Sequence, residues 1–402
     1  MEIGWPRNGQ VHDLLPLLAV IRMQVAKGVK EVAIHVAGDA WIEPAAICVL
    51  AVELTRLELR QIRFTGDAAK LNYLSRLDLF KILKFEYQEQ FTRHPEAGRF
   101  VPLMRISSGK DVHSAVSGIC DMVTRFLNSA KIFVPAMEWA VNEVVDNIVT
   151  HAQARTPGFV GAQYYPEKEE IKICIVDGGL GIRATLAERY RFSKDFEAIE
   201  KAIERGVTRN PEIGQGNGLA GTVQIVELND GEMTIYSGSG AFVSKHRSST
   251  FSKIESRFDG TIVSMLLRTN RPVDLMKTFM AEGATGWNYF DAEAQRLVES
   301  GGIRVANEIP HARGREPAKA LRNKVLCLLD SIDGGQKLRL DFDSVRTPSS
   351  SFWDELLGRL VAEISPETFR AKIEVVNMEP VSYALARTVV KQRMKSSSEE
   401  NS

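Results

Sequence analysis

Residues 139–151 read WAVNEVVDNIVTH, and this stretch decides how the rest of the chain is interpreted. Glu143, Asn147 and His151 are spaced four residues apart, so a helix places all three on one face. A carboxylate and an amide one helical turn apart can activate a water molecule and hold a hydrated Mg²⁺ ion, which prefers oxygen ligands. The stretch therefore predicts a helix over about 135–152 whose polar side chains face a cleft.

The second informative stretch, residues 173–182, reads ICIVDGGLGI. An apolar run that ends in Asp177 predicts a buried strand with a carboxylate at its end. Such a carboxylate can accept a hydrogen bond from an exocyclic amine. Gly179 and Gly181 follow it, and because they lack a Cβ atom their backbone can approach a flat ring closely.

The third stretch carries alternate glycines, Gly214, Gly216 and Gly218, directly before Leu219 and an apolar helical segment. Alternate glycines before a helix expose backbone N–H groups at a helix N-terminus, an arrangement that suits phosphate. A further strand begins at residues 259–264, DGTIVS, which include Thr261. Each stretch alone is compatible with an ordinary turn or a solvated helix face, but their order along the chain is far more specific.

In this order the stretches resemble the GHKL ATP-binding fold, which histidine kinases, type II topoisomerases and the large heat-shock chaperones share. The matching motifs are Glu143-x-x-x-Asn147 (N box), Asp177-x-Gly179-x-Gly181 (G1 box), Gly214-x-Gly216-x-Gly218-Leu219 (G2 box) and Gly260-Thr261 (final box). The resemblance covers about residues 100–270. Within that superfamily, the presence of His151 makes the chain most similar to the anti-sigma-factor serine kinases.

The resemblance implies ATP and Mg²⁺ as cofactors and gives each matching residue a role. Asn147 would coordinate Mg²⁺, Glu143 would act as the polarising catalytic base, and Asp177 would bind the adenine amino group. Segment 183–213 would form a lid over the triphosphate. The other residues expected to contact the nucleotide are His151, Gly179, Gly181, Gly214, Gly216, Gly218, Leu219 and Thr261.

Two blocks that alternate strands and helices flank this region, and both resemble STAS domains. In the later block a strand around 338–342 precedes the segment PSSSFWDEL, 348–356. We therefore expect an α+β protein in which a central GHKL α/β sandwich lies between two small STAS-like domains. The expected organisation is a STAS-like domain at 1–95, the GHKL domain at 99–270, a connecting segment at 271–310, a second STAS-like domain at 311–392 and a disordered tail at 393–402.

The second flanking block has serines at a predicted helix start. In STAS-type antagonists a serine at this place can be phosphorylated, which makes Ser349, Ser350 and Ser351 candidates. The sequence Ser351-x-x-Asp354 also matches a capping box, and helix capping is the interpretation we favour. The equivalent helix start of the first block, 42–46, has no hydroxyl group.

Composition narrows the possible partners. The chain has 402 residues, and its 51 Lys+Arg balance 51 Asp+Glu. It therefore lacks the net positive charge that is typical of nucleic-acid-binding proteins. No apolar run is long enough for a membrane span, the N-terminus lacks the pattern of a signal peptide, and four scattered cysteines form no CxxC motif. We expect a cytoplasmic protein that meets a protein partner through its STAS-like domains, with neither a membrane nor nucleic acid as a partner.

Three functions stay compatible with these residues. The first is a GHKL ATPase that acts as a regulatory switch, and the second is an anti-sigma-type protein serine/threonine kinase. The third is a non-catalytic nucleotide-binding scaffold, although the presence of both Glu143 and Asn147 argues against it. The first two differ only in whether water or a protein hydroxyl receives the γ-phosphate.

Overall fold

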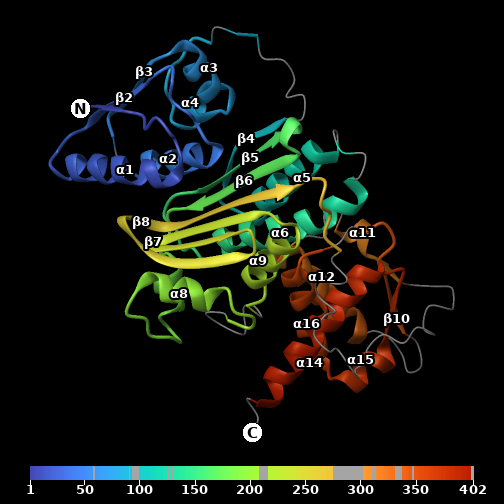
Figure 1. Cartoon of the computed structure of the whole chain (residues 1–402). Helices are drawn as coiled ribbons and strands as arrows, with labels where there is room; N and C mark the ends of the chain where they lie inside the picture. The colour runs from blue at the N-terminus through green and yellow to red at the C-terminus, as the bar shows by residue number, and fades with distance from the viewer. Residues whose placement is uncertain are drawn as a thin grey trace. The chain divides into compact units, whose positions relative to one another are not determined.

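A computed structural model describes the chain except for residues 58, 90, 93–98, 125–126, 128–129, 208–215, 275–301, 310–313, 331–336, 346–347 and 400–402. The chain is a mixed α+β protein that divides into two compact units (Figure 1). The N-terminal unit comprises residues 1–134, 144–203 and 226–272, and the C-terminal unit comprises residues 135–143, 204–225 and 273–402. Within the described ranges, every helix is too short or too polar to cross a membrane.

The strands of the N-terminal unit are β1 (Glu2–Gly4), β2 (Glu31–Val36), β3 (Gln61–Gly66), β4 (Phe100–Ile106), β5 (Gly158–Tyr165), β6 (Glu170–Asp177), β7 (Glu232–Lys245) and β8 (Ser248–Arg268). Its helices are α1 (Val11–Ala26), α2 (Pro44–Arg56), α3 (Ala68–Arg76), α4 (Leu79–Ile82), α5 (Gly109–Thr124), the 3₁₀ turn η1 (Pro166–Lys168), α7 (Ile182–Leu186) and α8 (Asp195–Ala202). Two further helices, α6 (Ala130–Thr150) and α9 (Gly218–Leu228), contribute residues to both units.

The centre of the N-terminal unit is a five-stranded antiparallel sheet in the order β4-β5-β6-β8-β7. Strand β6 is buried on both faces, which explains its nearly continuous apolar sequence. The structure confirms the buried strand that ends at Asp177, but β8 already begins at Ser248, well before the strand start that the sequence predicted at 259–264. Strands β7 and β8 form a long hairpin whose two-residue turn, His246 and Arg247, has positive φ without the usual glycine or asparagine.

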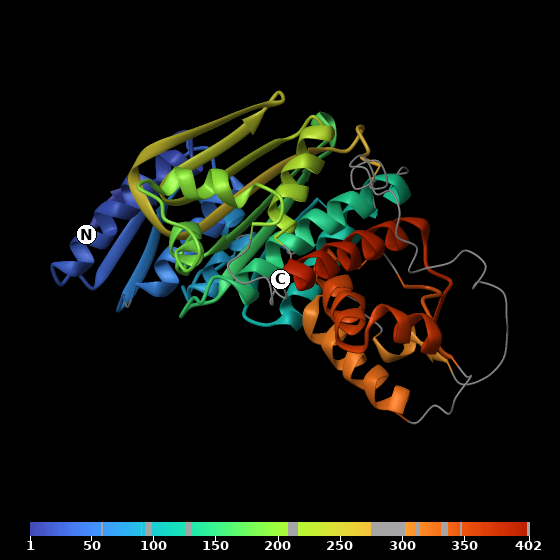
Figure 2. The ribbon, with the colours of Figure 1, turned by 90° about the horizontal axis from the view of Figure 1, so that it is seen from below.

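The first block packs against this central sheet. Its parallel sheet, β1-β2-β3, lies beside α1 and α2, and α2 is buried continuously from Pro44 to Leu54. A helix that is apolar on all sides needs cover on all sides, and α2 has it because it contacts β5 and β6. Helix α5 covers the opposite face of the central sheet, as two views at right angles show (Figures 1 and 2).

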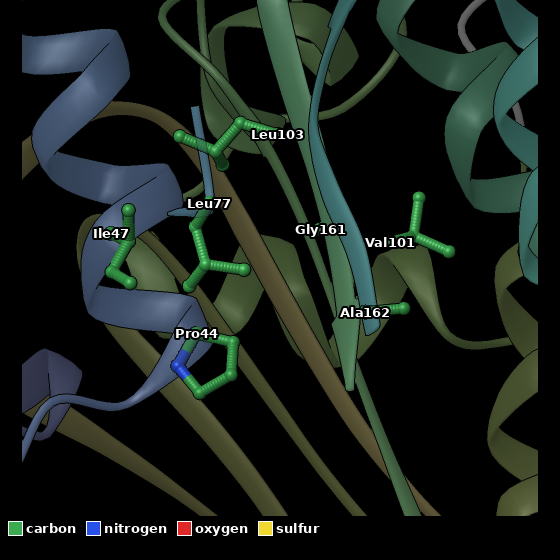
Figure 3. Close-up of a pocket in the computed structure, with 7 residues that line it drawn as sticks. All are labelled: Pro44, Ile47, Leu77, Val101, Leu103, Gly161 and Ala162. Atoms are coloured by element: carbon green, nitrogen blue, oxygen red, sulfur yellow. The ribbon is translucent and has the colours of Figure 1, made fainter. Parts of the chain in front are cut away.

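A small apolar pocket lies where α2 meets β4 and β5. Figure 3 shows Pro44 and Ile47 of α2 facing the strands that carry Leu103 and Gly161. The pocket has room for about one water molecule. This gap is a packing defect of the interface and cannot hold a nucleotide.

The C-terminal unit contains a second small parallel sheet, in the order β11-β10-β9. Its strands are β9 (Ile303–Arg304), β10 (Leu338–Asp341) and β11 (Ile373–Val376). Its helices are α11 (Val305–Glu308), α12 (Arg315–Asp330), α13 (Ser350–Trp353), the π-helical turn η3 (Asp354–Gly358), α14 (Arg359–Ile364), α15 (Pro366–Lys372) and α16 (Pro380–Glu399). Segments α13, η3 and α14 form one continuous helix whose side chains Phe352, Trp353 and Leu356 are fully buried.

Three details of this unit correct the sequence expectations. Strand β9 pairs with β10, so the segment expected to be a connection until residue 310 already contains part of the sheet. Helix α16 continues to Glu399, so the tail expected to be disordered from residue 393 is largely helical. The helix cap is Ser349, whose Oγ accepts the N–H of Phe352 at 3.2 Å, so the predicted capping box Ser351-x-x-Asp354 is wrong.

Candidate functional site

Asp177 is the last residue of β6, and its carboxylate is buried with 8% of the residue exposed. Its Oδ1 accepts the N–H of Gly179 at 2.8 Å, and it also accepts hydrogen bonds from the backbone and the hydroxyl of Thr261, its partner on β8. Burial raises the pKa of this carboxyl to about 6, although those hydrogen bonds act in the opposite direction. Burial therefore outweighs these hydrogen bonds, and the carboxyl takes up a proton more easily than an exposed aspartate does.

A β-bulge sets the position of Thr261. Ser237 pairs with Thr261 and the next β7 residue pairs with Phe258, so Asp259 and Gly260 are extra residues on β8. Gly260 has φ +126° and a Cβ atom there would lie 2.0 Å from the carbonyl oxygen of Asp177, so only glycine fits.

The hydroxyl of Ser237 ties the bulge to the glycine turn. Its Oγ donates to the carbonyl of Gly260 at 2.9 Å and accepts the N–H of Ile182, the first residue of α7, also at 2.9 Å. Gly181, with φ +76°, passes so close that a Cβ atom would lie 2.8 Å from this hydroxyl oxygen. Serine at 237 thus fixes the turn after Asp177 to the bulge before Thr261.

The glycine turn also rests against the end of α6. The N–H of Leu180 donates to the carbonyl of Ala152 at 2.9 Å, and a Cβ atom on Gly179 would lie 2.0 Å from that same oxygen. Asn147 and His151, near the end of α6, are half-buried. These contacts bring the end of the predicted metal-binding helix together with the turn that follows Asp177.

The fit of Gly179 against Ala152 gives a direct prediction. Gly179→Ala should destabilise the protein by about 2–3 kcal/mol, because a methyl group and a carbonyl cannot share this space. Urea unfolding measures the effect. Gly109→Ala is the matched control, since a Cβ atom at residue 109 meets nothing within 4 Å. Equal stability of the two variants would contradict this packing.

Glu143 belongs to the C-terminal unit and is buried, with 8% of the residue exposed. Its Oε1 accepts two hydrogen bonds from Ser350, one from the backbone N–H at 2.9 Å and one from the hydroxyl at 2.6 Å. Ser350 is the first residue of α13, so the carboxylate also lies at the positive end of the helix that runs to Ile364. The predicted catalytic base is therefore held by one of the three candidate serines.

The glycine loop before α9 is the other predicted element in this unit. Gly216 has φ +69°, and a Cβ atom on Gly218 would lie 2.3 Å from Oε2 of Glu143. Asn217 donates to Gln392 of α16 at 2.5 Å. Both Glu143 and this loop thus contact helices of the C-terminal α/β block.

The predicted site residues fall into two groups. Those in the N-terminal unit are Asn147, His151, Asp177, Gly179, Gly181 and Thr261, and those in the C-terminal unit are Glu143, Gly216, Gly218 and Leu219. Gly214 lies outside the described residues. Helix α6 contains both Glu143 and Asn147, one turn apart, as the four-residue spacing predicted.

Sequence reasoning missed Ser237 and the partnership between Glu143 and Ser350. Ser237 lies in a Gly/Ser-rich stretch, YSGSG, in which no feature distinguishes one serine from the next. Ser350 was named as one of three serines, but a hydrogen bond between residues 207 positions apart leaves no local pattern.

Comparison with protein families identifies part of this chain. Residues 318–383 match the model of a STAS-like domain of unknown function (DUF4325). This range includes β10, α13 and β11, so the C-terminal unit carries a STAS-like domain, and Ser350 lies within it. No curated protein matches the chain.

Proposed function

We propose that this protein is an ATP- and Mg²⁺-binding regulatory switch in which the STAS-like domain controls the Glu143 carboxylate. The observation that carries the proposal is the pair of hydrogen bonds from Ser350 to Glu143 Oε1. In the GHKL interpretation Glu143 is the base for nucleotide turnover. A base whose oxygen already accepts two donors from a regulatory domain is a poor proton acceptor, so release of Ser350 would raise turnover.

The surroundings of Asp177 fit the adenine end of a nucleotide. A buried carboxylate with a pKa raised to about 6 gains when it accepts another donor, and the exocyclic amine of adenine is such a donor. Gly179 and Gly181 let the turn after this carboxylate pack closely against Ala152 and Ser237, which fixes the position of the turn. The guanine ring presents a carbonyl oxygen at the same place, so this carboxylate should select ATP over GTP.

Asn147 fits the metal end because its amide oxygen is a ligand type that Mg²⁺ accepts and its side chain is half-buried rather than enclosed. Bound Mg²⁺ would neutralise phosphate charge. Glu143, one turn earlier on α6, would take the proton of the attacking hydroxyl. The STAS-like domain supports a protein partner, since domains of this kind often mediate protein interactions.

Calorimetric titration of the full chain with ATP, with and without Mg²⁺, tests the nucleotide site. We expect the wild type to bind Mg-ATP and Asn147→Ala to lose about tenfold in affinity when Mg²⁺ is present. No binding by the wild type would refute the site, and an unchanged affinity in the variant would remove Asn147 from it. Binding without any release or transfer of phosphate would instead favour the non-catalytic scaffold.

The 2.6 Å contact between Ser350 Oγ and Glu143 also supports a second function, protein serine kinase activity on Ser350 itself. The distance is that of a nucleophile and its general base. In this reaction Ser350 Oγ would bond to the γ-phosphorus of ATP as its bond to the bridging oxygen breaks. The hydroxyl proton would pass to Glu143, and ADP would leave. Mass spectrometry after incubation with Mg-ATP tests whether Ser350 becomes phosphoserine.

A further inference from the structure

The C-terminal end of α2, in the first α/β block, contains a buried charge that the switch does not use. Glu53 is fully buried in an otherwise apolar stretch of α2, and burial raises the pKa of its carboxyl. Arg56, one turn later, donates to Glu53 Oε2 at 2.5 Å, and Arg22 of α1 lies 3.5 Å from the same oxygen. A buried carboxylate without such partners would destabilise the folded protein, so the charge of Glu53 holds both arginines in place.

Each arginine uses its other donor on the backbone of β8. Arg56 Nη1 donates to the carbonyl of Asp259 at 2.7 Å, and Arg22 Nη2 donates to the carbonyl of Arg257 at 2.5 Å. The guanidinium of Arg56 also lies over the ring of Phe258, 5.5 Å from its centroid. Glu53 therefore orients two arginines that hydrogen-bond to backbone carbonyls in the segment immediately before Gly260.

The hydrogen bond from Arg56 lies in the β-bulge next to Asp177. The bulge takes the carbonyls of Asp259 and Gly260 out of the regular ladder, and side chains satisfy both: Arg56 binds the first and Ser237 binds the second. The next residue is Thr261, which hydrogen-bonds the Asp177 carboxylate. Two links, from Arg56 to the bulge and from the bulge to Thr261, thus join α2 to Asp177.

We infer that Arg56, oriented by Glu53, is a positioning residue for the part of the nucleotide site around Asp177 that would bind the nucleobase. The first α/β block would thereby set the affinity of the nucleotide site and its preference for adenine over guanine. The inference rests on the proposed ATP site. A second contact from α2 supports it, because a Cβ atom on Gly178, directly after Asp177, would lie 3.0 Å from Val52. Any shift of α2 would therefore displace both the bulge and the turn after Asp177.

The test variant is the double substitution Glu53→Gln/Arg56→Met in the full chain. It removes the hydrogen bond from Arg56 to the carbonyl of Asp259 without leaving a buried carboxylate that has lost its partner. The matched control is Glu43→Gln/Lys172→Met, which removes the 2.8 Å ion pair between Glu43, at the opposite end of α2, and Lys172 of the central sheet. Near-UV circular dichroism and urea unfolding establish that both proteins fold.

Two readouts are compared. The first is the affinity for Mg-ATP and Mg-GTP by calorimetry, for which we expect the test variant to lose about tenfold in ATP affinity and most of its preference for ATP. The second is amide hydrogen exchange at residues 258–262 without nucleotide, which we expect to be faster in the test variant and unchanged in the control.

The outcomes separate this inference from the proposed function. ATP affinity, selectivity and exchange all equal to the wild type in the test variant would overturn the role of Arg56. The same loss in both double variants would also overturn it, because the effect would then reflect general weakening of the α2 interface. If the wild type binds no ATP, the proposed function fails, and exchange at residues 258–262 alone decides whether Arg56 holds the bulge.

Discussion

Ser350→Ala is expected to raise the rate of ATP hydrolysis by about tenfold, because it removes the 2.6 Å hydrogen bond from the hydroxyl to Glu143. The backbone N–H of Ser350 remains a donor at 2.9 Å, so release is only partial in this variant. Ser350→Pro should raise the rate further. Proline has no N–H, its ring atom would push the carboxylate away, and the first position of a helix accepts it without strain.

Phosphate release by the purified full chain measures these rates. Ser351→Ala is the matched control, since Ser351 Oγ contacts Ser349 Oγ at 2.9 Å and Glu143 is bonded to Ser350 instead. Glu143→Gln in the Ser350→Ala background should abolish the added activity. The switch is refuted if Ser350→Ala and Ser350→Pro hydrolyse ATP no faster than Ser351→Ala. A loss of phosphoserine in Ser350→Ala, without faster hydrolysis, would favour the kinase.

The parts of the site that the sequence predicted are those with local patterns. The four-residue spacing of Glu143 and Asn147 gave their helix, and the apolar run before Asp177 gave the buried strand with a carboxylate at its end. Gly181 and Gly216 lie in the two glycine-rich stretches that the sequence analysis singled out, and both have positive φ. In each case the chemistry depends on residues within about one turn or one strand of each other.

The rest depends on contacts between distant residues. The β7–β8 hairpin extends through a serine-rich, half-exposed segment and turns at His246 and Arg247, so neither alternation nor turn residues marked it. Glu53 was one charge at the end of an apolar helix. Arg56 follows it on the same helix, but the second partner, Arg22, belongs to α1, and only the packing of α1 beside α2 brings it to Glu53. The pairing of Glu143 with Ser350 is set by tertiary structure in the same way.

Asp177→Asn is expected to have opposite effects on function and stability. ATP affinity should fall by about 30-fold, because the amide replaces a charged acceptor of the adenine amine with a neutral one. Stability at pH 7.5 should rise by about 1–2 kcal/mol. A carboxyl with a pKa raised from 3.8 to about 6 costs the folded state about 3 kcal/mol at neutral pH, and the loss of charge-assisted hydrogen bonds offsets part of the gain.

The pH dependence identifies the cause of that gain. Protonation of Asp177 stabilises the folded state, and this contribution is complete below pH 3.8 and is lost as the pH rises through about 6. Urea unfolding at several pH values should therefore show an advantage of Asp177→Asn that is largest above pH 7 and shrinks towards pH 5. Asp39→Asn, at an exposed residue paired with Arg7, is the control and should show no such trend. An advantage that is constant with pH would mean that the substitution acts through packing, and the buried charge would then no longer support the proposed binding of the adenine amine by Asp177.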